Sequence, residues 1–549
     1  MTRQTKAVEG LDMVMNNAGG FTFKVSPMDQ LDRFLILGSE ANAYKGAADV
    51  TKDNAKNVIA LLRTQPEAVI KRTVEISKEG RAPKNEYALF VLALAAADSK
   101  VETRRRALAA LPEVARTPTH LFAFVGYVKQ FRGWGRTLSK AVRNWYLIKA
   151  PDQLAYQVVK YQSRDGWANS DLLRLSHPKA KNAQYDAVFR WVTGGIDATK
   201  ASTYSRTAAD GSKVSIKRKD VSGKLPEIIQ AFEEAKTAGE NRIVQLILDH
   251  NLPREAVPTA HLNSKVVWEA LLEKMPMTAL IRNLATMTRN DVFATKANVD
   301  KVIAQVTNQE ILRKSRIHPM NILSALRTYE AGRGVRGNNI WVPNRDITQA
   351  LDKAFYKAFG NVTPTNKPTV LGIDVSGSMT QPISGFVTLT AREASMAMAL
   401  ITAAVEPNHR LLAFTPGGFS NDRGNTWSRS SVKEIEIDPK GGLTKALRDT
   451  ANMPFAGTDC ALPMLWADNM GYAAENFSVY TDNETYYGSI HPYQALKDFR
   501  KNHNVPAKLA VFGMTATSFS IADPSDAGMM DFAGFDSAAP QLASEFFSK

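Results

Sequence analysis

The stretch Thr369-Val-Leu-Gly-Ile373-Asp374-Val-Ser376-Gly-Ser378 marks a change of fold within the chain. Its first five residues form a short apolar run, which is typical of a buried parallel strand. Asp374, Ser376 and Ser378 then place one carboxylate and two hydroxyls on the turn after that strand. Ligands bind at the carboxyl ends of strands in open α/β sheets, so the stretch predicts both a sheet and a site at its edge.

Downstream of this stretch, strand-like and helix-like segments alternate. The apolar runs lie at residues 410–414, 477–480 and 508–512. Helical patterns lie at residues 391–404, 444–452, 461–469 and 493–501. This βαβ alternation predicts a doubly wound α/β domain over residues 361–549.

Upstream, residues 1–360 have the pattern of successive helices. Apolar residues recur at spacings of three and four in segments 54–62, 67–77, 85–97, 226–236 and 241–248. Prolines fall between or at the starts of such segments, where a missing N–H is tolerated. They are Pro66, Pro83, Pro112, Pro118, Pro151, Pro226, Pro253, Pro276 and Pro319. We expect a HEAT-like stack of helix pairs or, since no strict repeat is visible, an irregular all-α domain.

Length and composition indicate at least two domains in a reducing compartment. The chain has 549 residues, of which 44% are hydrophobic and 22% charged, enough to bury more than one core. No apolar run reaches the roughly 18 residues of a membrane-spanning helix, and residues 1–10 lack the apolar stretch of a signal peptide. Cys460 is the only cysteine, which excludes internal disulfides. We therefore expect a soluble, cytoplasmic protein without a membrane partner.

The positive charge of the chain is unevenly distributed. The formal net charge is +15, yet residues 361–549 contain 14 Lys and Arg against 19 Asp and Glu. Residues 1–360 contain 55 against 35, so the whole basic excess lies in the helical part. Such asymmetry is typical of a domain that binds a polyanion such as nucleic acid, although a solvated lysine-rich surface gives the same count. The polar segment 201–223 predicts a long exposed loop or short hairpin that either touches RNA or is simply solvated.

Two later loops carry groups that match the turn after the first strand. Gly457-Thr458-Asp459 precedes a predicted helix, and Thr481-Asp482-Asn483 follows the run at residues 477–480. All of these donors are hard oxygens, which suit Mg²⁺, with Mn²⁺ or Ca²⁺ as alternatives. Any one loop alone is ordinary turn chemistry. The three loops together, in this order, indicate a divalent-metal site.

The D-x-S-x-S turn, then Thr458, then Asp482, resembles the metal-ion-dependent adhesion site of von Willebrand factor A domains. The resemblance implies that Ser376, Ser378 and Thr458 coordinate the metal directly. It also implies that Asp374 and Asp482 act mainly through bound water or as outer hydrogen-bond acceptors.

The densest basic and aromatic cluster of the helical part begins at Lys160. Lys160 and Arg164 are four residues apart, so on a helix they would share one face and reach consecutive phosphates. Trp167 and His177 add planar groups able to stack on bases. The alternatives are a core position for Trp167 and a solvated face for the two cations.

The sequence contains no pattern of an enzyme. It lacks a G-x-x-x-x-G-K-[ST] loop, a G-x-S-x-G turn and an H-E-x-x-H helix, and its eight histidines are scattered. A metal-dependent nuclease could use Asp374 and Asp482, but a hydroxyl-rich site without an obvious base suits ligand capture better. We therefore predict a non-enzymatic protein. The alternative role is a protein-interaction platform whose metal site grips an acidic partner.

Several segments resemble the signatures of the TROVE domain of the Ro autoantigen family, in its bacterial form. They are Arg164-Asp-Gly-Trp, Asp171-Leu-Leu-Arg174-Leu-Ser-His177, Arg116-Thr-Pro-Thr-His-Leu-Phe122, Trp134-Gly-Arg136, Met275-Pro-Met-Thr-Ala-Leu-Ile-Arg-Asn-Leu284 and Arg316-Ile-His-Pro319. Gly457-Thr-Asp-Cys-Ala-Leu-Pro463 and Thr481-Asp-Asn-Glu484 continue the resemblance through the second domain. It spans roughly residues 30–515, and the tail beyond about Phe519 matches nothing in it.

The resemblance implies a ring of HEAT-like repeats closed by the von Willebrand factor A-like domain. The outer surface would bind a small structured Y RNA, and the central hole would take single-stranded 3′ ends of misfolded RNAs. Lys160, Arg164 and His177 match the family's Y RNA contacts. Arg174 lies in the same motif, while Arg136 and Lys140 are candidates for the basic surface. The implied role is RNA quality control and stress response, with a 3′ exoribonuclease, polynucleotide phosphorylase, tethered through Y RNA.

Overall fold

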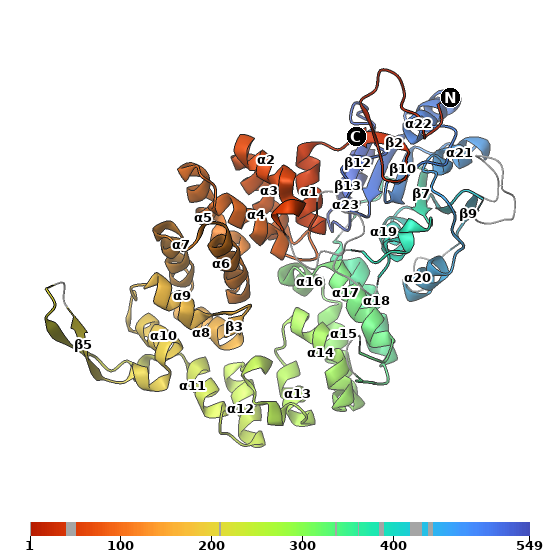
Figure 1. Cartoon of the computed structure of the whole chain (residues 1–549). Helices are drawn as coiled ribbons and strands as arrows, with labels where there is room; N and C mark the ends of the chain where they lie inside the picture. The colour runs from red at the N-terminus through yellow and green to blue at the C-terminus, as the bar shows by residue number, and fades with distance from the viewer. Residues whose placement is uncertain are drawn as a thin grey trace.

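The computed structural model describes residues 2–39, 51–207, 210–334, 338–360, 362–383, 389–417, 431–436 and 443–549. A long series of helices is followed by an α/β domain whose first strand begins at Thr369. Figure 1 shows the helices following an arc that returns toward its start, with the α/β domain lying against both ends. The predicted architecture, a helical ring closed by a doubly wound domain, is thereby confirmed.

The helices of the arc begin where the sequence supplies caps and prolines. They are α1 (Pro27–Leu37), α2 (Lys56–Thr64), α3 (Pro66–Glu79), α4 (Glu86–Ala96), α5 (Val101–Val114), α6 (Pro118–Arg132), α7 (Arg136–Leu147), α8 (Pro151–Lys160), α9 (Asn169–Ser176), α10 (Ala183–Gly194), α11 (Glu227–Ala235), α12 (Glu240–His250), α13 (Lys265–Leu272), α14 (Met277–Arg289), α15 (Lys296–Val306), α16 (Gln309–Ser315), α17 (Pro319–Glu330) and α18 (Arg345–Ala358). Pro66, Pro118, Pro151 and Pro319 occupy first helical positions, as expected. Pro112 instead lies inside α5, close to its end, where little helix remains to be disrupted.

The α/β domain contains a six-stranded sheet in the order β13-β11-β10-β7-β8-β9. Its strands are β7 (Thr369–Asp374), β8 (His409–Phe414), β9 (Val432–Glu434), β10 (Asn476–Thr481), β11 (Lys508–Gly513) and β13 (Met529–Ala533). All pairs are parallel except β8 with β9. After β7 the chain adds β8 on one side and later β10 on the other, so the carboxyl ends of β7 and β10 form the topological switch point.

Helices cover both faces of this sheet. They are α19 (Ala391–Ala403), α20 (Leu443–Ala451), α21 (Leu462–Asn469), α22 (Pro492–His503) and α23 (Ala539–Ser548). Leu371 and Ile373 of β7 belong to a core that also contains α19, α23 and the helical arc. Val370 belongs to a second core with α21 and α22. One face of the sheet therefore shares its core with the arc, which joins the two parts into one packed unit.

The first residues of the chain pack on the α/β domain rather than on the helices. β1 (Met13–Met15) pairs with β2 (Phe21–Lys24), which pairs with β12 (Phe519–Ser520). The Gln4 side-chain amide donates to Asp459 Oδ1 at 2.7 Å. The expectation of helices from residue 1 is therefore wrong for residues 2–24, because the strand partner of this segment lies at the other end of the chain. The tail beyond Phe519, for which no role was expected, supplies β13 and α23.

Two seams hold the α/β domain to the ends of the arc. At the first, buried Arg81 pairs with Asp536 at 2.5 Å and buried Arg33 pairs with Asp531 at 2.8 Å. At the second, the Asp352 carboxylate accepts a hydrogen bond from the backbone N–H of Leu443 at 2.8 Å. Charged contacts thus close the ring at both ends.

Among the described residues, no helix combines the length and apolar character required to cross a membrane.

Candidate RNA interface and metal site

The turn after β7 brings three of the predicted metal-site residues together. Asp374 Oδ1 accepts from the backbone N–H of Ser376 at 2.9 Å. The hydroxyl oxygens of Ser376 and Ser378 lie 3.3 Å apart. Neighbouring ligands of an octahedral Mg²⁺ with bonds of roughly 2.1 Å are about 3 Å apart, so this spacing suits two adjacent positions around one cation.

Asp374 is tied to the end of β10, which carries Asp482. The Thr481 hydroxyl donates to Asp374 Oδ2 at 2.7 Å, and the backbone N–H of Glu484 donates to Asp482 Oδ1 at 3.1 Å. Both carboxylates are fully buried. Burial, and then repulsion from Asp482, raise the pKa of Asp374. The two buried acids and the Ser376 and Ser378 hydroxyls form a hard-oxygen set that fits a divalent cation.

The loop that carries Thr458 is held against the other two loops. The backbone N–H of Gly377 donates to the Ala456 carbonyl at 3.3 Å, and the Thr458 carbonyl accepts from Tyr486 and Tyr487. The Gly457 position is tight, because an added Cβ would lie 3.0 Å from the Tyr486 hydroxyl. The three predicted loops therefore meet at one edge of the sheet.

Arg392 holds these loops together through hydrogen bonds, a role that was not predicted from the sequence. Its guanidinium donates to the Val375 carbonyl at 2.6 Å and to the Met453 carbonyl at 2.9 Å, and the residue is 1% exposed. A charged residue within the alanine- and methionine-rich pattern of residues 391–403 was the available signal. Asp459, named in the sequence as part of the Thr458 loop but given no separate role, is a further buried acid. Its pKa is raised to about 7 by burial.

The predicted pair Lys160 and Arg164 does not share a helix. α8 ends at Lys160, and Arg164 lies in β3 (Ser163–Arg164), which pairs with β4 (Trp167–Ala168) across a tight turn. The chain leaves the helix at Tyr161, with φ −118°, and the positive φ values of Asp165 and Gly166, 53° and 76°, form the turn between β3 and β4. The expectation of one helical face is therefore wrong: Arg164 is 66% exposed on the turn.

Lys160 is half-buried at the end of α8. Its ammonium lies 5.7 Å from the ring centre of Tyr156 and 5.6 Å from that of Tyr161. Burial lowers its pKa, while the nearby Glu255 carboxylate opposes that change. Lys160 therefore packs more closely into the protein than Arg164 does.

The other predicted RNA residues lie on α7, α9 and the end of α9. Arg136, Lys140, Arg174 and His177 are all exposed. His177 caps α9 in the left-handed conformation, with φ 48°. The Ser139 hydroxyl donates to the Ser176 carbonyl at 3.4 Å, which brings the α7 residues beside His177. The β3–β4 hairpin that carries Arg164 precedes α9, and His177 follows it, so the two lie toward opposite ends of an eight-residue helix about 12 Å long.

Trp167 is half-buried rather than a core residue. The ammonium of Lys129, on α6, lies 5.0 Å from its ring centre. Gly126, Lys129, Gly166, Trp167 and Asp171 line a shallow depression there. Lys129 was missed because it lies far from Trp167 in the sequence.

A second basic site lies where the two ends of the helical arc meet. Lys84, Arg116, Lys314 and Arg316 help to line a pocket of about 440 Å³, and no described lining residue is acidic. Burial, and then the charge of Arg316, lower the pKa of Arg116 to about 10. Its residues come from distant parts of the chain, so no local pattern could reveal the pocket.

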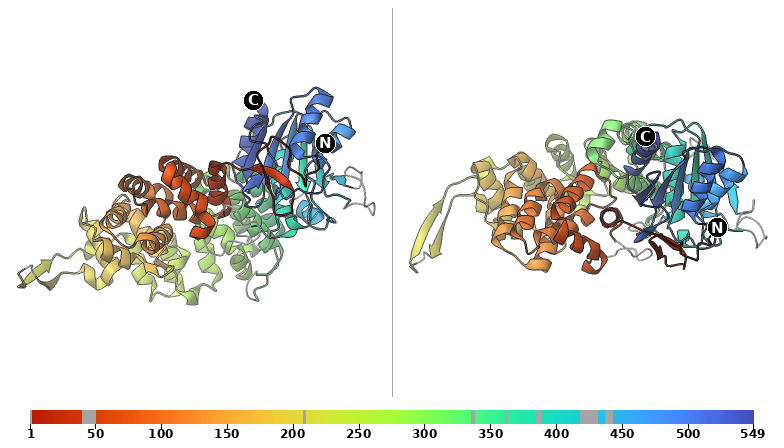
Figure 2. Two further views of the ribbon diagram at one scale, coloured as in Figure 1. Left: turned by 45° about the horizontal axis from the view of Figure 1, so that its top comes forward. Right: turned by 90° about the horizontal axis from the view of Figure 1, so that it is seen from above.

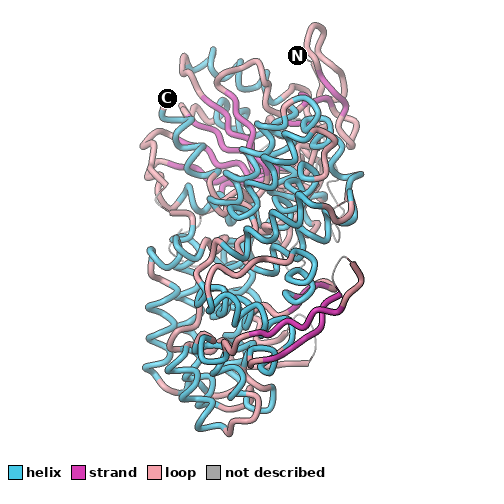
Figure 3. Tube along the Cα trace, turned by 90° about the vertical axis from the view of Figure 1, so that its left-hand side faces the viewer, coloured by secondary structure: helices cyan, strands magenta, loops and turns pink. Residues whose placement is uncertain are grey.

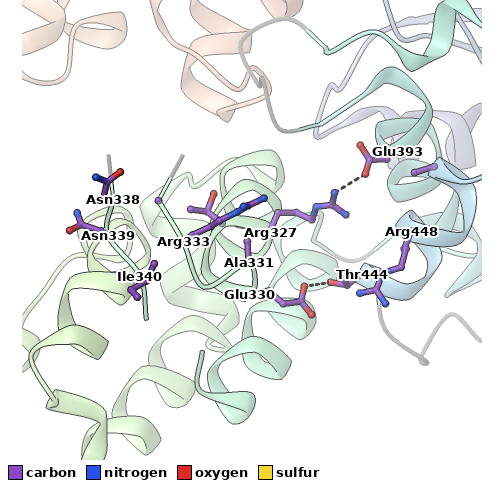
Figure 4. A pocket seen from close by; sticks show the side chains of 13 residues that line it. Arg327, Glu330, Ala331, Arg333, Asn338, Asn339, Ile340, Glu393, Thr444 and Arg448 are labelled. Carbon is purple, nitrogen blue, oxygen red and sulfur yellow. Dashed lines mark hydrogen bonds and ion pairs between the residues drawn. The ribbon is translucent and has the colours of Figure 1, made fainter. Parts of the chain in front are cut away.

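The second seam also contains a pocket, of about 940 Å³ (Figure 4). Arg327 points across the junction to Glu393, with which it pairs at 2.8 Å. The Thr444 hydroxyl donates to Glu330 at 2.8 Å. Because Glu393 follows Arg392, this seam adjoins the brace of the metal-site loops.

Comparisons with known proteins cover nearly the whole chain. A family model described as the TROVE domain matches residues 14–328, and one described as the Ro60 vWA domain matches residues 369–547. RNA-binding protein RO60 from Caenorhabditis elegans is 38% identical, with 97% of this chain and 90% of that protein covered. RNA-binding protein RO60 from Deinococcus radiodurans is 36% identical, covering 97% and 95%. The crystal structure of the Deinococcus radiodurans RO (RSR) protein matches with a TM-score of 0.67 and 34% identity, covering 95% of this chain and 99% of that chain.

Proposed function

Because this chain belongs to the Ro60 family, we propose that it is a non-enzymatic RNA-binding protein. Both curated relatives are named RNA-binding proteins, which agrees with the lack of an enzyme pattern in the sequence. The outer surface around α9 binds a small structured RNA of the Y RNA type. The exposure of Arg136, Lys140, Arg164, Arg174 and His177 around one helix carries this assignment.

These residues suit an RNA backbone. Arginine and lysine neutralise phosphates, and arginine and histidine also stack on unpaired bases. Trp167 supplies a further flat surface beside Lys129. Structured RNA with exposed loops therefore fits this face better than a protein would.

The pocket between the ends of the arc is the candidate site for a single-stranded 3′ end of a misfolded RNA. Its four basic side chains and the absence of acidic groups among the described lining residues favour a phosphate chain. Asn85, Thr117 and Asn321 add uncharged hydrogen-bonding groups to the lining. Binding outside and inside the ring would select RNAs that combine a folded part with a free end.

In this proposal the protein acts in the quality control of non-coding RNA and in stress responses. A Y RNA on the outer face would compete with misfolded RNA for part of the surface. The same RNA would tether a 3′ exoribonuclease such as polynucleotide phosphorylase, so that RNAs held by the ring meet the nuclease.

A second role, capture of an acidic protein partner, is favoured at the metal site. Ser376, Ser378 and Thr458 would hold Mg²⁺ or a similar cation, which attracts a carboxylate from a partner. Phe455 and Tyr487 are 61% and 47% exposed, and their rings would lie 3.3 Å and 3.2 Å from a Cβ added at Gly377 and Gly457 of the metal-site loops. Exposed aromatic side chains beside a cation suit a partner that offers an acid flanked by apolar residues.

An RNA titration tests the main proposal. A structured RNA with a single-stranded 3′ tail is compared with its blunt counterpart, for wild type and for the triple variant Lys160→Ala/Arg164→Ala/His177→Ala. We expect tighter binding of the tailed RNA and weaker binding by the variant. If about six phosphates are contacted, affinity should fall with a log–log salt slope near −4 to −5. A flat salt response, or no binding by wild type at low salt, would contradict RNA binding.

A further inference from the structure

A two-stranded hairpin projects from the helical ring. β5 (Ser202–Thr207) pairs antiparallel with β6 (Lys213–Arg218), and the ribbon extends away from the body in Figures 1 and 2. Figure 3, seen from the hairpin side, shows the two strands in front of the helices. An isolated hairpin of this kind buries little surface and is only marginally stable in water. The ribbon therefore contributes little to the core of the ring.

The base of the hairpin is fixed to the ring. The Val221 N–H donates to the Thr199 carbonyl at 2.9 Å, and the Arg190 guanidinium donates to the Lys219 carbonyl at 3.0 Å. α10, which carries Arg190, also carries Thr193, whose carbonyl accepts from Arg174 of the predicted RNA surface. The hairpin therefore starts beside that surface, and its base is hydrogen-bonded to the same helix, α10.

One face of the ribbon consists of hydroxyl and ammonium groups. Residues paired directly across an antiparallel ribbon share a face, and faces alternate along each strand. The pairs Thr203 with Lys217, Ser205 with Ser215, and Thr207 with Lys213 fall on the same face. All six residues of these pairs are exposed. We call this set the hydroxyl–lysine face.

The charge of the segment matches a polyanion. Residues 200–219 contain six Lys and Arg and one acidic residue, Asp210. The Asp210 carboxylate is engaged at the tip, where it accepts from the Ser212 N–H at 3.0 Å and from the Ser212 hydroxyl at 2.7 Å. Lysines and hydroxyls are donors to phosphate oxygens, and hydroxyls also exchange hydrogen bonds with the 2′-OH of RNA.

We propose that the hydroxyl–lysine face lies in the minor groove of a double-stranded RNA stem whose other parts are held by the ring. A six-residue strand is about 20 Å long, enough to cross the wide, shallow minor groove of A-form RNA. That groove exposes 2′-hydroxyls between two lines of phosphates, which matches hydroxyl side chains flanked by lysines. This contact recognises the shape of the RNA groove rather than its base sequence. This inference rests on the proposed RNA binding and extends it to the stem of the RNA.

Stem length is the variable that tests the hairpin. Two tailed RNAs are compared, one with a stem of about 16 base pairs and one about a third as long. Wild type should bind the long stem more tightly. Lys213→Gln/Lys217→Gln should remove that gain, weaken long-stem binding on the order of tenfold, and make its salt slope shallower by about 1.5. The matched control is Lys497→Gln/Lys501→Gln, which removes two exposed lysines from α22 of the α/β domain.

The outcomes separate the two proposals. If wild type binds neither RNA, RNA binding itself fails. If wild type binds both and the triple variant at Lys160, Arg164 and His177 loses affinity, but the hairpin variant behaves like its control, only the hairpin assignment is overturned. That result would point to a protein partner for the ribbon.

A tethered cleavage probe locates the hairpin directly. The native Cys460 is fully buried, so Ser212→Cys would provide one accessible thiol at the ribbon tip. An iron chelate on that thiol should cleave the stem within a few base pairs, on both strands across one minor groove. The same chelate on Lys501→Cys should not. Cleavage confined to the tail, or absent, would contradict the proposed position.

Discussion

The imidazole Nε2 of His318 lies 3.0 Å from the backbone carbonyl of Arg81, 237 residues earlier in the chain. The same nitrogen lies 3.0 Å from the carbonyl of Phe535, while Nδ1 accepts from the Met320 N–H at 3.1 Å. His318 therefore joins the start of the arc, its end and the α/β domain. The neutral ring with a proton on Nε2 satisfies all three contacts, whereas a second proton on Nδ1 would remove the Met320 bond.

The first prediction concerns acid stability. Burial lowers the pKa of His318 to about 4, from an ordinary value of 6.5. The unfolded chain then binds more protons than the folded one between these values, so His318 stabilises the fold fully above pH 6.5 and less as pH falls toward 4. At pH 5 the loss is about 2 kcal/mol. Urea unfolding at pH 7, 6 and 5 should show a shallower pH dependence for His318→Gln than for wild type.

Two features of that experiment isolate His318. The raised pKa of Asp459 acts in the opposite direction, so only the difference between variant and wild type is informative. His177→Ala, which removes an exposed histidine, serves as the control and should match wild type. If wild type and His318→Gln showed equal pH dependence, His318 would not be a source of the loss of stability in acid.

The second prediction concerns the first seam. Arg81 and Asp536 are 6% and 5% exposed, so Arg81→Ala leaves a buried carboxylate without its partner. We expect a loss of about 3–5 kcal/mol in the free energy of unfolding, and a smaller loss for Arg81→Met/Asp536→Leu, which removes both charges. Lys78→Ala, which breaks an exposed pair with Glu113, should cost no more than about 1 kcal/mol. Urea unfolding measures all three, and a double variant as unstable as Arg81→Ala would contradict this account.

The third prediction concerns the metal site. Mg²⁺ at about 100 times its dissociation constant should stabilise wild type by about 2.7 kcal/mol relative to chelator, because it binds only the folded state. Ser376→Ala/Ser378→Ala should remove this stabilisation. Ser395→Ala, which removes a buried hydroxyl bonded within α19, should retain it. Thermal unfolding with and without Mg²⁺ gives the readout, and an equal response of both variants would argue against serine ligation.

The fourth prediction separates the two cations of the outer surface. Arg164→Ala should weaken RNA binding by about 1–3 kcal/mol without lowering protein stability, because the side chain is exposed. Lys160→Ala should lower both quantities, since Lys160 is half-buried and its ammonium lies over the rings of Tyr156 and Tyr161. RNA titration and urea midpoints, measured on the same preparations, distinguish them. Loss of stability in Arg164→Ala would contradict its assignment as a surface residue. Full stability in Lys160→Ala would contradict the packing role of Lys160.

Local patterns in the sequence determined the fold class. Helical periodicity, prolines at helix starts and the run at residues 369–373 each depend on residues close in sequence, which is why the predicted elements match the observed ones. The metal-site loops could be predicted from the sequence for the same reason. Parallel strands end at one edge of a sheet, so groups that follow β7 and β10 must come together.

Tertiary structure alone decided how the ring closes and which groups it presents. Arg81 with Asp536 and Gln4 with Asp459 are each 455 residues apart, and no periodicity links such pairs. Lys160 and Arg164 do not keep helical spacing because α8 ends at Lys160, Tyr161 leaves the helical conformation with φ −118°, and Arg164 pairs with Trp167 in a hairpin. The basic pocket likewise exists only because Arg116 and Arg316 are brought together when the arc closes. Spacing along the chain sets local structure, whereas contacts across the ring depend on how the whole chain packs.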